Sequence, residues 1–217
     1  NVGEQNVCYV HVSLIPYLPA AGELKTKPTQ HSVKELRSIG IQPDVLVCRT
    51  SRPLSAGVKE KLSLFTDVPV ERVIEALDAG SIYEVPLTLE DEGLGRAIGE
   101  RLGLQTPPPD LAEWGEIVDR IRRPSSTVQI ALVGKYMGVE DSYVSIVEAL
   151  HHGGIAHRAR VEITKVDSEE LERLTQEEVD AHLSAFGGIA VCPGFGGRGV
   201  EGKVKAIRFA REAKIPF

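Results

Sequence analysis

Hydrophobic positions along this chain alternate between two spacings, one typical of strands and the other typical of helices. Residues 7–15 alternate and are rich in β-branched side chains, and residues 45–47 form a continuous apolar run. Further strands are predicted at residues 128–133, 161–166 and 188–192. Helices are predicted at residues 32–39, 55–64, 90–102, 142–152, 168–183 and 202–214, and around Trp114 and Ile117. Residues 72–77 and 82–85 fit either structure. This alternation predicts an α/β fold built on parallel sheets.

A proline-rich segment near the middle of the chain predicts a break between two domains. Three prolines in a row, Pro107 to Pro109, fit neither a helix interior nor a central strand. A second strand–helix alternation begins after residues 124–126. Because parallel sheets bind ligands at the carboxyl ends of their strands, the loops that follow strands are the first places to look for chemistry.

Composition and charge argue against several classes of protein. The chain is 42% apolar and 26% charged, as soluble globular proteins are, and no run of 18 apolar residues predicts a transmembrane helix. Its net charge is −6, with 25 basic and 31 acidic residues interspersed, which argues against general binding of nucleic-acid backbones. The three cysteines and six histidines show neither metal-site spacing nor a disulfide framework.

The two ends of the sequence predict that the chain is an interior portion of a longer protein. It begins at residues 1–3 without an initiator methionine and stops at residues 215–217, where the pattern predicts the start of another strand. The first residues contain no charged-then-apolar signal segment, so a cytoplasmic location is expected.

The first cluster of candidate chemistry is residues 25–30, between a predicted strand and a predicted helix. It holds two lysines, two threonines and a glutamine around one proline, and a helix N-terminus that favours anions follows. This combination is typical of a polyphosphate site. The alternative is a solvated lysine-rich loop in which Thr29 caps the helix.

The second cluster is the glycine-rich loop at residues 192–203, which follows a buried strand. Glycines let main-chain N–H groups approach a ligand closely, so such a loop suits a phosphate or an oxyanion. Gly194, Gly196 and Gly199 also match G-x-G-x-x-G, but the loop is not the first βα turn of its domain. A flexible surface loop is the alternative.

A third cluster, residues 134–136, follows the strand at 128–133 but lacks the first glycine of a P-loop. Asp141 is expected to cap the next helix, and Tyr143 is expected to pack. We expect a structural role for this cluster.

Several of these segments together resemble the CTP synthase family. Residues 23–36, which read ELKTKPTQHSVKEL, are similar to the nucleotide-binding stretch of that family, and the resemblance continues in order through GIQPD, GKY and FGGRGVEGK. The family aminates UTP to CTP: a synthetase domain uses ATP and Mg2+, and a class I glutamine amidotransferase domain supplies ammonia. The resemblance implies a P-loop/Rossmann-like amidoligase part at residues 1–103, a linker at 104–126, and a flavodoxin-like glutaminase part at 127–217.

The resemblance also implies roles for individual positions. Those that hold the triphosphate of UTP, or of the inhibitor CTP, are Lys25, Thr26, Lys27, Pro28, Thr29, Gln30 and Lys61. Those at the ATP site are Leu77, Asp78 and Ala79, with Arg49 a further candidate. Gly194 would donate its main-chain N–H to the oxyanion of glutamine hydrolysis. Phe195 and Arg198 would lie on the loop linked to GTP, the allosteric activator.

The chain departs from the family pattern in one loop, and several catalytic parts are expected outside it. The family has Pro-Gly-Gly-Phe-Gly where this chain has Cys192-Pro193-Gly194-Phe195-Gly196, so one glycine has become proline and a backbone donor is lost. The P-loop and the Mg2+ ligands are expected before residue 1 and the nucleophilic cysteine just after Phe217. Cys192 is not expected to be that nucleophile. This chain alone is expected to be inactive.

Two other functions remain open from the sequence. The G-x-G-x-x-G match indicates an NAD-type oxidoreductase, which would leave residues 25–30 without a role. A non-catalytic nucleotide-sensing module is the other alternative. The resemblance implies a homotetramer, with filaments in some members, and no nucleic-acid or membrane partner.

Overall fold

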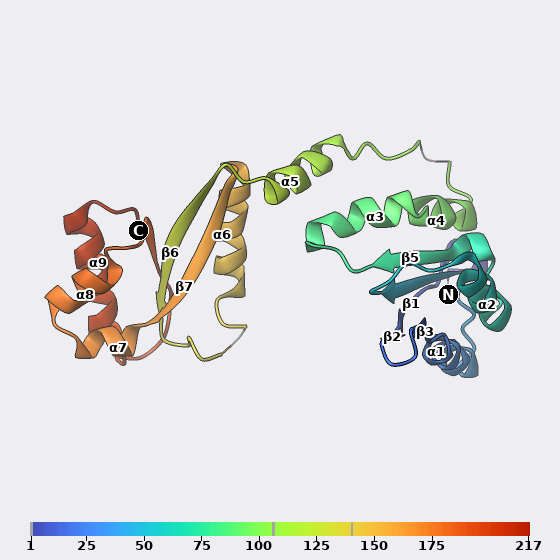
Figure 1. The fold of residues 1–217 in the computed structure, drawn as a ribbon, viewed down its shortest axis with the longest axis horizontal. Coiled ribbons are helices and arrows are strands. Elements are labelled where there is room, and N and C mark those ends of the chain that lie inside the picture. The colour runs from blue at the N-terminus through green and yellow to red at the C-terminus, as the bar shows by residue number, and fades with distance from the viewer. Residues whose placement is uncertain (1, 106, 140) are drawn as a thin grey trace. The chain divides into compact units, whose positions relative to one another are not determined.

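The computed structural model describes residues 2–105, 107–139 and 141–217. The chain divides into two compact units, Asn1–Gly115 and Glu116–Phe217, and each is built on a three-stranded parallel sheet (Figure 1). The α/β fold with parallel sheets predicted from the sequence is therefore confirmed. No helix within the described ranges is long and apolar enough to cross a membrane.

In the first unit the strand order is β1-β4-β5, with all neighbours parallel. A two-stranded antiparallel hairpin, β2 with β3, lies between β1 and the first helix. The elements described are, in order, η1 (Glu4–Asn6), β1 (Val10–Ile15), β2 (Tyr17–Leu18), β3 (Glu23–Leu24), α1 (Lys27–Ser38), β4 (Val45–Thr50), α2 (Ala56–Thr66), η2 (Val70–Arg72), β5 (Val73–Leu77), η3 (Ile82–Glu84), α3 (Val85–Asp91) and α4 (Leu94–Leu102).

The central strand β4 is buried on both faces, as its continuous apolar sequence requires. Leu46 and Cys48 point to one face, where they pack with Val33 of α1 and Leu62 of α2. The alternate residues of β4 point to the other face, which packs with Ala97 of α4 and Leu89 of α3. The two-residue period of the strand thus produces two cores, one on each side of the sheet.

In the second unit the strand order is β7-β6-β8, again with all neighbours parallel. The first strand along the chain lies between the second and the third, as in the flavodoxin-like order. The elements described from residue 107 onward are α5 (Ala112–Arg122), which contains the division between the units, β6 (Ser126–Gly134), α6 (Val144–Ala156), β7 (Ala159–Asp167), α7 (Ser168–Arg173), α8 (Gln176–Leu183), β8 (Gly188–Val191) and α9 (Val200–Ala213).

The core of the second unit lies between β6 and the helices α7, α8 and α9. Ala131 and Val133 of β6 are fully buried against Leu171, Leu183 and Phe209, one from each of these helices. Helix α6 packs on the sheet at β7, where Gly154 lies so close that a side chain would meet the carbonyl oxygen of Ala159. The loops that follow β6 and β8 begin at the carboxyl ends of these two strands.

Two of the predicted helices are each divided into two by one residue whose backbone is not helical. The helix predicted at 90–102 is two helices, because Gly93 has φ 84° between them. The helix predicted at 168–183 is also two, because Leu174 is extended and Thr175 then begins α8 with a capping box. Residues 72–77 contain a strand and 82–85 contain a 3-10 turn.

The predicted caps of α1 and α6 were wrong. Helix α1 begins at Lys27, earlier than predicted, so Thr26 and not Thr29 occupies the N-cap position. Pro28 at the second helical position has the fixed φ that a helix start requires. Tyr143, with φ 66°, and not Asp141, occupies the N-cap of α6.

Candidate functional site

Residues 25–30 lead into α1 and form its first turn, and hydrogen bonds attach this turn to the carboxyl end of β1. The hydroxyl of Ser13 donates to Thr29 Oγ1 at 2.9 Å, and Thr29 Oγ1 donates to the carbonyl of Leu14 at 3.2 Å. Thr29 is fully buried, and Gln30 Nε2 donates to the buried Thr26 Oγ1 at 3.1 Å. The two threonines therefore fix the position of the helix N-terminus.

Three lysines lie around this helix start. The side chain of Lys25 pairs with Glu23, and Lys27 occupies the first, exposed position of α1. The hydrogen bond from Lys25 lowers the pKa of Glu23 below its ordinary value, and the charge of Lys61 on α2 lowers it further. Lys61, which is 34 positions further along the chain than Lys27, therefore lies within electrostatic range of Glu23. The structure thus places residues 25–30 at one helix start, with Lys61 of α2 in range of Glu23, the partner of Lys25.

The four predicted ATP residues line one pocket of about 390 Å³ in the same unit. Leu77 ends β5, and Asp78 and Ala79 follow it, while Arg49 lies near the end of β4. Arg49 Nη2 lies 3.2 Å from Asp78 Oδ1, and the N–H of Asp78 donates to Thr50 at 2.9 Å. The remaining lining residues, which the sequence did not single out, are Val12, Val47, Ala76, Ile82, Val85, Thr88 and Leu89. A mainly apolar pocket with polar backbone at one edge suits a flat heterocyclic base.

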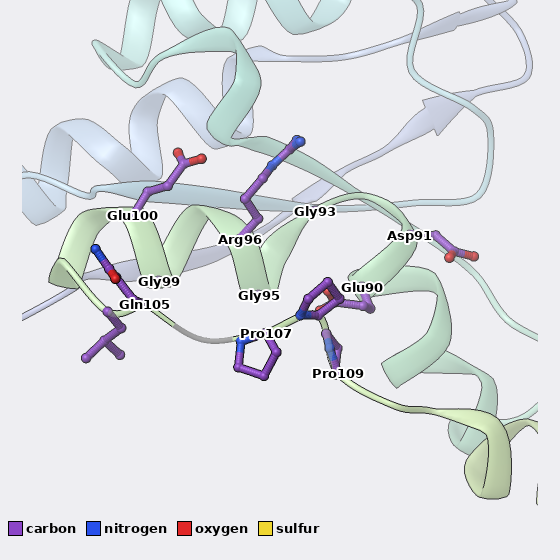
Figure 2. Close-up of a pocket in the computed structure, with 12 residues that line it drawn as sticks. Glu90, Asp91, Gly93, Gly95, Arg96, Gly99, Glu100, Gln105, Pro107 and Pro109 are labelled. Atoms are coloured by element: carbon purple, nitrogen blue, oxygen red, sulfur yellow. The ribbon is translucent and has the colours of Figure 1, made fainter.

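A larger cavity, about 710 Å³, lies between helix α4 and the proline-rich segment. The segment that carries Pro107 runs beside Gly95 and Gly99 of α4, with Glu90 close to it (Figure 2). None of the residues predicted from the sequence to bind nucleotide lines this cavity. The sequence identified the proline segment only as a linker, because nothing local indicates that it packs on a glycine-lined helix.

The glycine-rich loop of the second unit follows β8 and is held by side chains from other elements. Lys135, directly after β6, is 5% exposed, and its Nζ donates to the carbonyls of Phe195 at 2.7 Å and Gly196 at 2.6 Å. Lys203 Nζ donates to the carbonyl of Cys192 at 2.7 Å. Burial and the nearby charge of Lys135 lower the pKa of Lys203 from its ordinary value. Lys135, expected from the sequence to be structural, is therefore part of this site.

Helix α7 holds the far end of the same loop. Arg198 Nε lies 2.9 Å from Glu169 Oε1, and the N–H of Gly199 donates to Glu172 Oε2 at 2.9 Å. Gly199 has φ 69°, and a side chain there would meet Ser168 Oγ at 2.5 Å. Phe195, by contrast, is 95% exposed. The loop thus has a fixed backbone and presents one aromatic side chain outward.

Two of the three cysteines, Cys48 and Cys192, are buried and are not placed as nucleophiles. Burial raises the pKa of the Cys48 thiol to about 12 and that of Cys192 to about 11. Cys192, the first residue of the glycine-rich loop, is 2% exposed. Within the described residues, no group of three or more His, Cys, Asp or Glu side chains could hold a metal ion.

Alkylation of the native chain with iodoacetamide at pH 8 is expected to spare Cys48 and Cys192. A thiol with a pKa near 11 is about 0.1% ionised at that pH, against about a quarter for an ordinary thiol, so alkylation should be more than 100-fold slower. Mass spectrometry of tryptic peptides measures the rate at each site, and the urea-unfolded chain is the control. Labelling of native Cys192 at the unfolded rate would contradict this assignment.

Two family models match the chain: residues 1–104 match the one described as CTP synthase N-terminus, and residues 138–217 the one described as glutamine amidotransferase class-I. A CTP synthase of Ruminiclostridium cellulolyticum is 58% identical over 216 residues, and one of Methanococcus maripaludis is 55% identical over 220. Each alignment covers 100% of this chain but only 40% and 41% of the relative, so the chain spans about two fifths of their length.

A solved structure titled as the glutaminase domain of Trypanosoma brucei CTPS with bound acivicin is 44% identical. The match covers 41% of this chain and 34% of the Trypanosoma brucei chain, with a TM-score of 0.38.

Proposed function

The chain belongs to the CTP synthase family, and from that premise we propose that it is part of an enzyme that aminates UTP to CTP. ATP phosphorylates the uracil C4 oxygen, and ammonia from glutamine displaces that phosphate in the last step of de novo CTP synthesis. GTP activates the reaction and CTP inhibits it. The observation that carries the proposal is that both candidate nucleotide sites of the first unit lie at the carboxyl ends of one parallel sheet.

We assign residues 1–103 to the synthetase domain, 104–126 to the linker and 127–217 to the glutaminase domain. Because the chain spans about two fifths of its relatives, the P-loop, the Mg2+ ligands and the nucleophilic cysteine are assigned to other parts of the complete polypeptide. The chain alone is expected to be inactive.

In the synthetase part, the lysines at the start of α1 hold the triphosphate of UTP or CTP. Lys25, Lys27 and Lys61 supply positive charge, and the free N–H groups of the α1 N-terminus add to it. Buried Thr26 and Thr29 keep this terminus in place. The adenine of ATP occupies the pocket beside Leu77–Ala79, where main-chain groups read the edge of the base and Arg49 lies at the rim.

In the glutaminase part, the loop after β8 stabilises the anion formed when a thiolate attacks the glutamine amide. The main-chain N–H of Gly194 donates to that oxyanion, and hydrolysis then releases ammonia and glutamate. Phe195 and Arg198 bind GTP on the outer side of the loop, because an exposed aromatic ring and a guanidinium suit a purine and its phosphates. GTP must compete with Glu169 for Arg198.

The other two functions considered from the sequence gain no support from these matches. The G-x-G-x-x-G spacing follows β8, the third strand of its unit along the chain, and not the first βα turn that a dinucleotide fold uses. We further propose a cytoplasmic homotetramer that can assemble into filaments in the manner of some family members, with nucleotides and glutamine as its ligands.

The proposal is tested on the complete polypeptide that carries this chain, with UTP, ATP and Mg2+. We expect CTP to form with ammonia alone, and with glutamine to an extent that GTP increases. CTP formation from neither nitrogen source would overturn the proposal. CTP from ammonia but not from glutamine would overturn the assignment of the second unit only.

A further inference from the structure

Four carbonyl groups of the glycine-rich loop accept hydrogen bonds from side chains beneath the loop. Lys203 binds the carbonyl of Cys192, and Lys135 binds those of Phe195 and Gly196. The hydroxyl of Tyr143 donates to the carbonyl of Pro193 at 3.0 Å. We call Lys135, Tyr143 and Lys203 the carbonyl clamp.

The clamp determines where the N–H groups of the loop point. In a planar trans peptide the N–H points opposite to the carbonyl of the preceding residue. A carbonyl of Pro193 held by Tyr143 therefore directs the N–H of Gly194 away from the clamp. In the same way, the carbonyls of Phe195 and Gly196, which Lys135 holds, direct the N–H groups of Gly196 and Gly197 away from the clamp. Across the part of the chain that the structure describes, these three N–H groups have no acceptor.

We propose that Tyr143 and Lys135 are positioning residues that aim the oxyanion donors of the glutaminase loop. This inference rests on the proposed function and extends it to two residues outside the loop. An oxyanion site is effective because its donors are oriented before the reaction begins. Carbonyls fixed by an ammonium and a phenol supply that orientation, since a peptide plane held at its oxygen resists flipping.

The local structure around Tyr143 supports a role beyond packing. Tyr143 has φ 66°, a conformation that is unfavourable for a non-glycine residue and is common at functional sites. Its ring reaches the loop only because Gly134 has no side chain, since a Cβ there would lie 2.9 Å from the ring. Its hydroxyl also lies 3.3 Å from the backbone N of Lys135, which donates to it. Tyr143 thereby links the end of β6 to the loop.

The clamp also accounts for how the loop accommodates Pro193. Proline removes an N–H but keeps its carbonyl, and the clamp uses carbonyls alone. The N–H proposed to bind the oxyanion belongs to Gly194, which the proline does not alter. The loop can therefore lose one donor at 193 and still present the donors at 194, 196 and 197.

The test measures glutamine hydrolysis and ammonia-dependent CTP synthesis in the complete polypeptide. Tyr143→Phe removes one oxygen atom and should lower kcat for glutamine about 10-fold, while Lys135→Met should lower it roughly 100-fold. KM for glutamine should stay within about twofold, because the lost interaction acts mainly in the transition state. Lys135→Arg should recover at least part of the loss, and ammonia-dependent synthesis should be unchanged.

Lys205→Met is the matched control. Lys205 on α9 also donates to backbone carbonyls, including that of Glu172 at 2.9 Å, but none of them belongs to the loop at 192–197. Lys205→Met should lower thermal stability without selectively lowering kcat for glutamine hydrolysis. An unchanged kcat in Tyr143→Phe, or an equal loss in Lys205→Met, would overturn the inference. Absence of glutamine hydrolysis in the unmodified protein would instead overturn the proposed function.

Discussion

Replacing Lys27 by alanine in the complete polypeptide is expected to raise KM for UTP about 10- to 100-fold. Lys27 is exposed at the first position of α1, beside the free N–H groups of the helix start. A hydrogen bond between a charged donor and a phosphate contributes about 1.5–3 kcal/mol, which corresponds to that range. No buried contact is lost, so the thermal stability should change little.

The same substitution should weaken inhibition by CTP by a similar factor, because both nucleotides present the same triphosphate. Lys34→Ala is the matched control: Lys34 is exposed on the same helix but two turns from its N-terminus. Steady-state kinetics with UTP varied at saturating ATP and ammonia, repeated with CTP added, measure both constants. If the two substitutions had equal effects, the assignment of Lys27 to the triphosphate site would be contradicted.

The candidate cluster at residues 25–30 could be identified from the sequence because its residues are close together along the chain. Lys25 and Lys27 lie two positions apart, and a helix pattern follows them at once. The helix start predicted from the sequence is too late because residues 27–31 contain no aliphatic or aromatic hydrophobic side chain that would extend the apolar helix pattern. Pro28 was attributed to a loop, although its fixed φ also suits the first turn of a helix.

The supporting residues of the second site could not be predicted in the same way. Lys135 lies 60 positions before Phe195, and the two meet because β6 and β8 are neighbours in the sheet. The sequence did contain a signal for Lys135, because residues that follow adjacent parallel strands meet at one edge of the sheet. Using it requires the strand order, and periodicity alone does not supply that order. The positive φ of Tyr143 has no counterpart in the sequence pattern, which favours Asp141 as the cap.

The proposed functions of both units depend on backbone N–H groups fixed by buried side chains. In the first unit, Thr29 attaches the start of α1 to β1 through its hydroxyl. In the second, Lys135 holds loop carbonyls through its ammonium. In each case the ligand would meet N–H groups and exposed cations, while the anchoring residue itself stays buried. The residues with the largest effect on function therefore include some that a ligand never touches.

Replacing Gly202 by alanine is expected to destabilise the second unit by about 1–2 kcal/mol. Gly202 is buried where α9 crosses α7, and an added Cβ would overlap the carbonyl oxygen of Ser168 and lie 2.9 Å from the backbone N of Glu172. Both obstacles are backbone atoms, so no side chain can rotate away and the helices must separate. Overpacking of this kind costs about 1–3 kcal/mol or more, and alanine's helix propensity regains only about 1.

The matched control for Gly202→Ala is Gly153→Ala. Gly153 also lies in a helix of the second unit, but its Cβ would meet nothing within 4 Å. That substitution should stabilise the unit by about 0.5–1 kcal/mol, opposite in sign to Gly202→Ala. Urea unfolding followed by circular dichroism measures both, and amide exchange of α9 peptides locates the change.

Separation of α9 from α7 would also disturb the loop between β8 and α9. Glu172 of α7 accepts from the N–H of Gly199 at the start of α9, so moving the two helices apart lengthens that bond. Gly202→Ala is therefore expected to lower glutamine hydrolysis along with stability, whereas Gly153→Ala should change stability alone. Equal stability of the Gly202→Ala and unmodified proteins would show that α7 and α9 do not pack as closely as the structure has them.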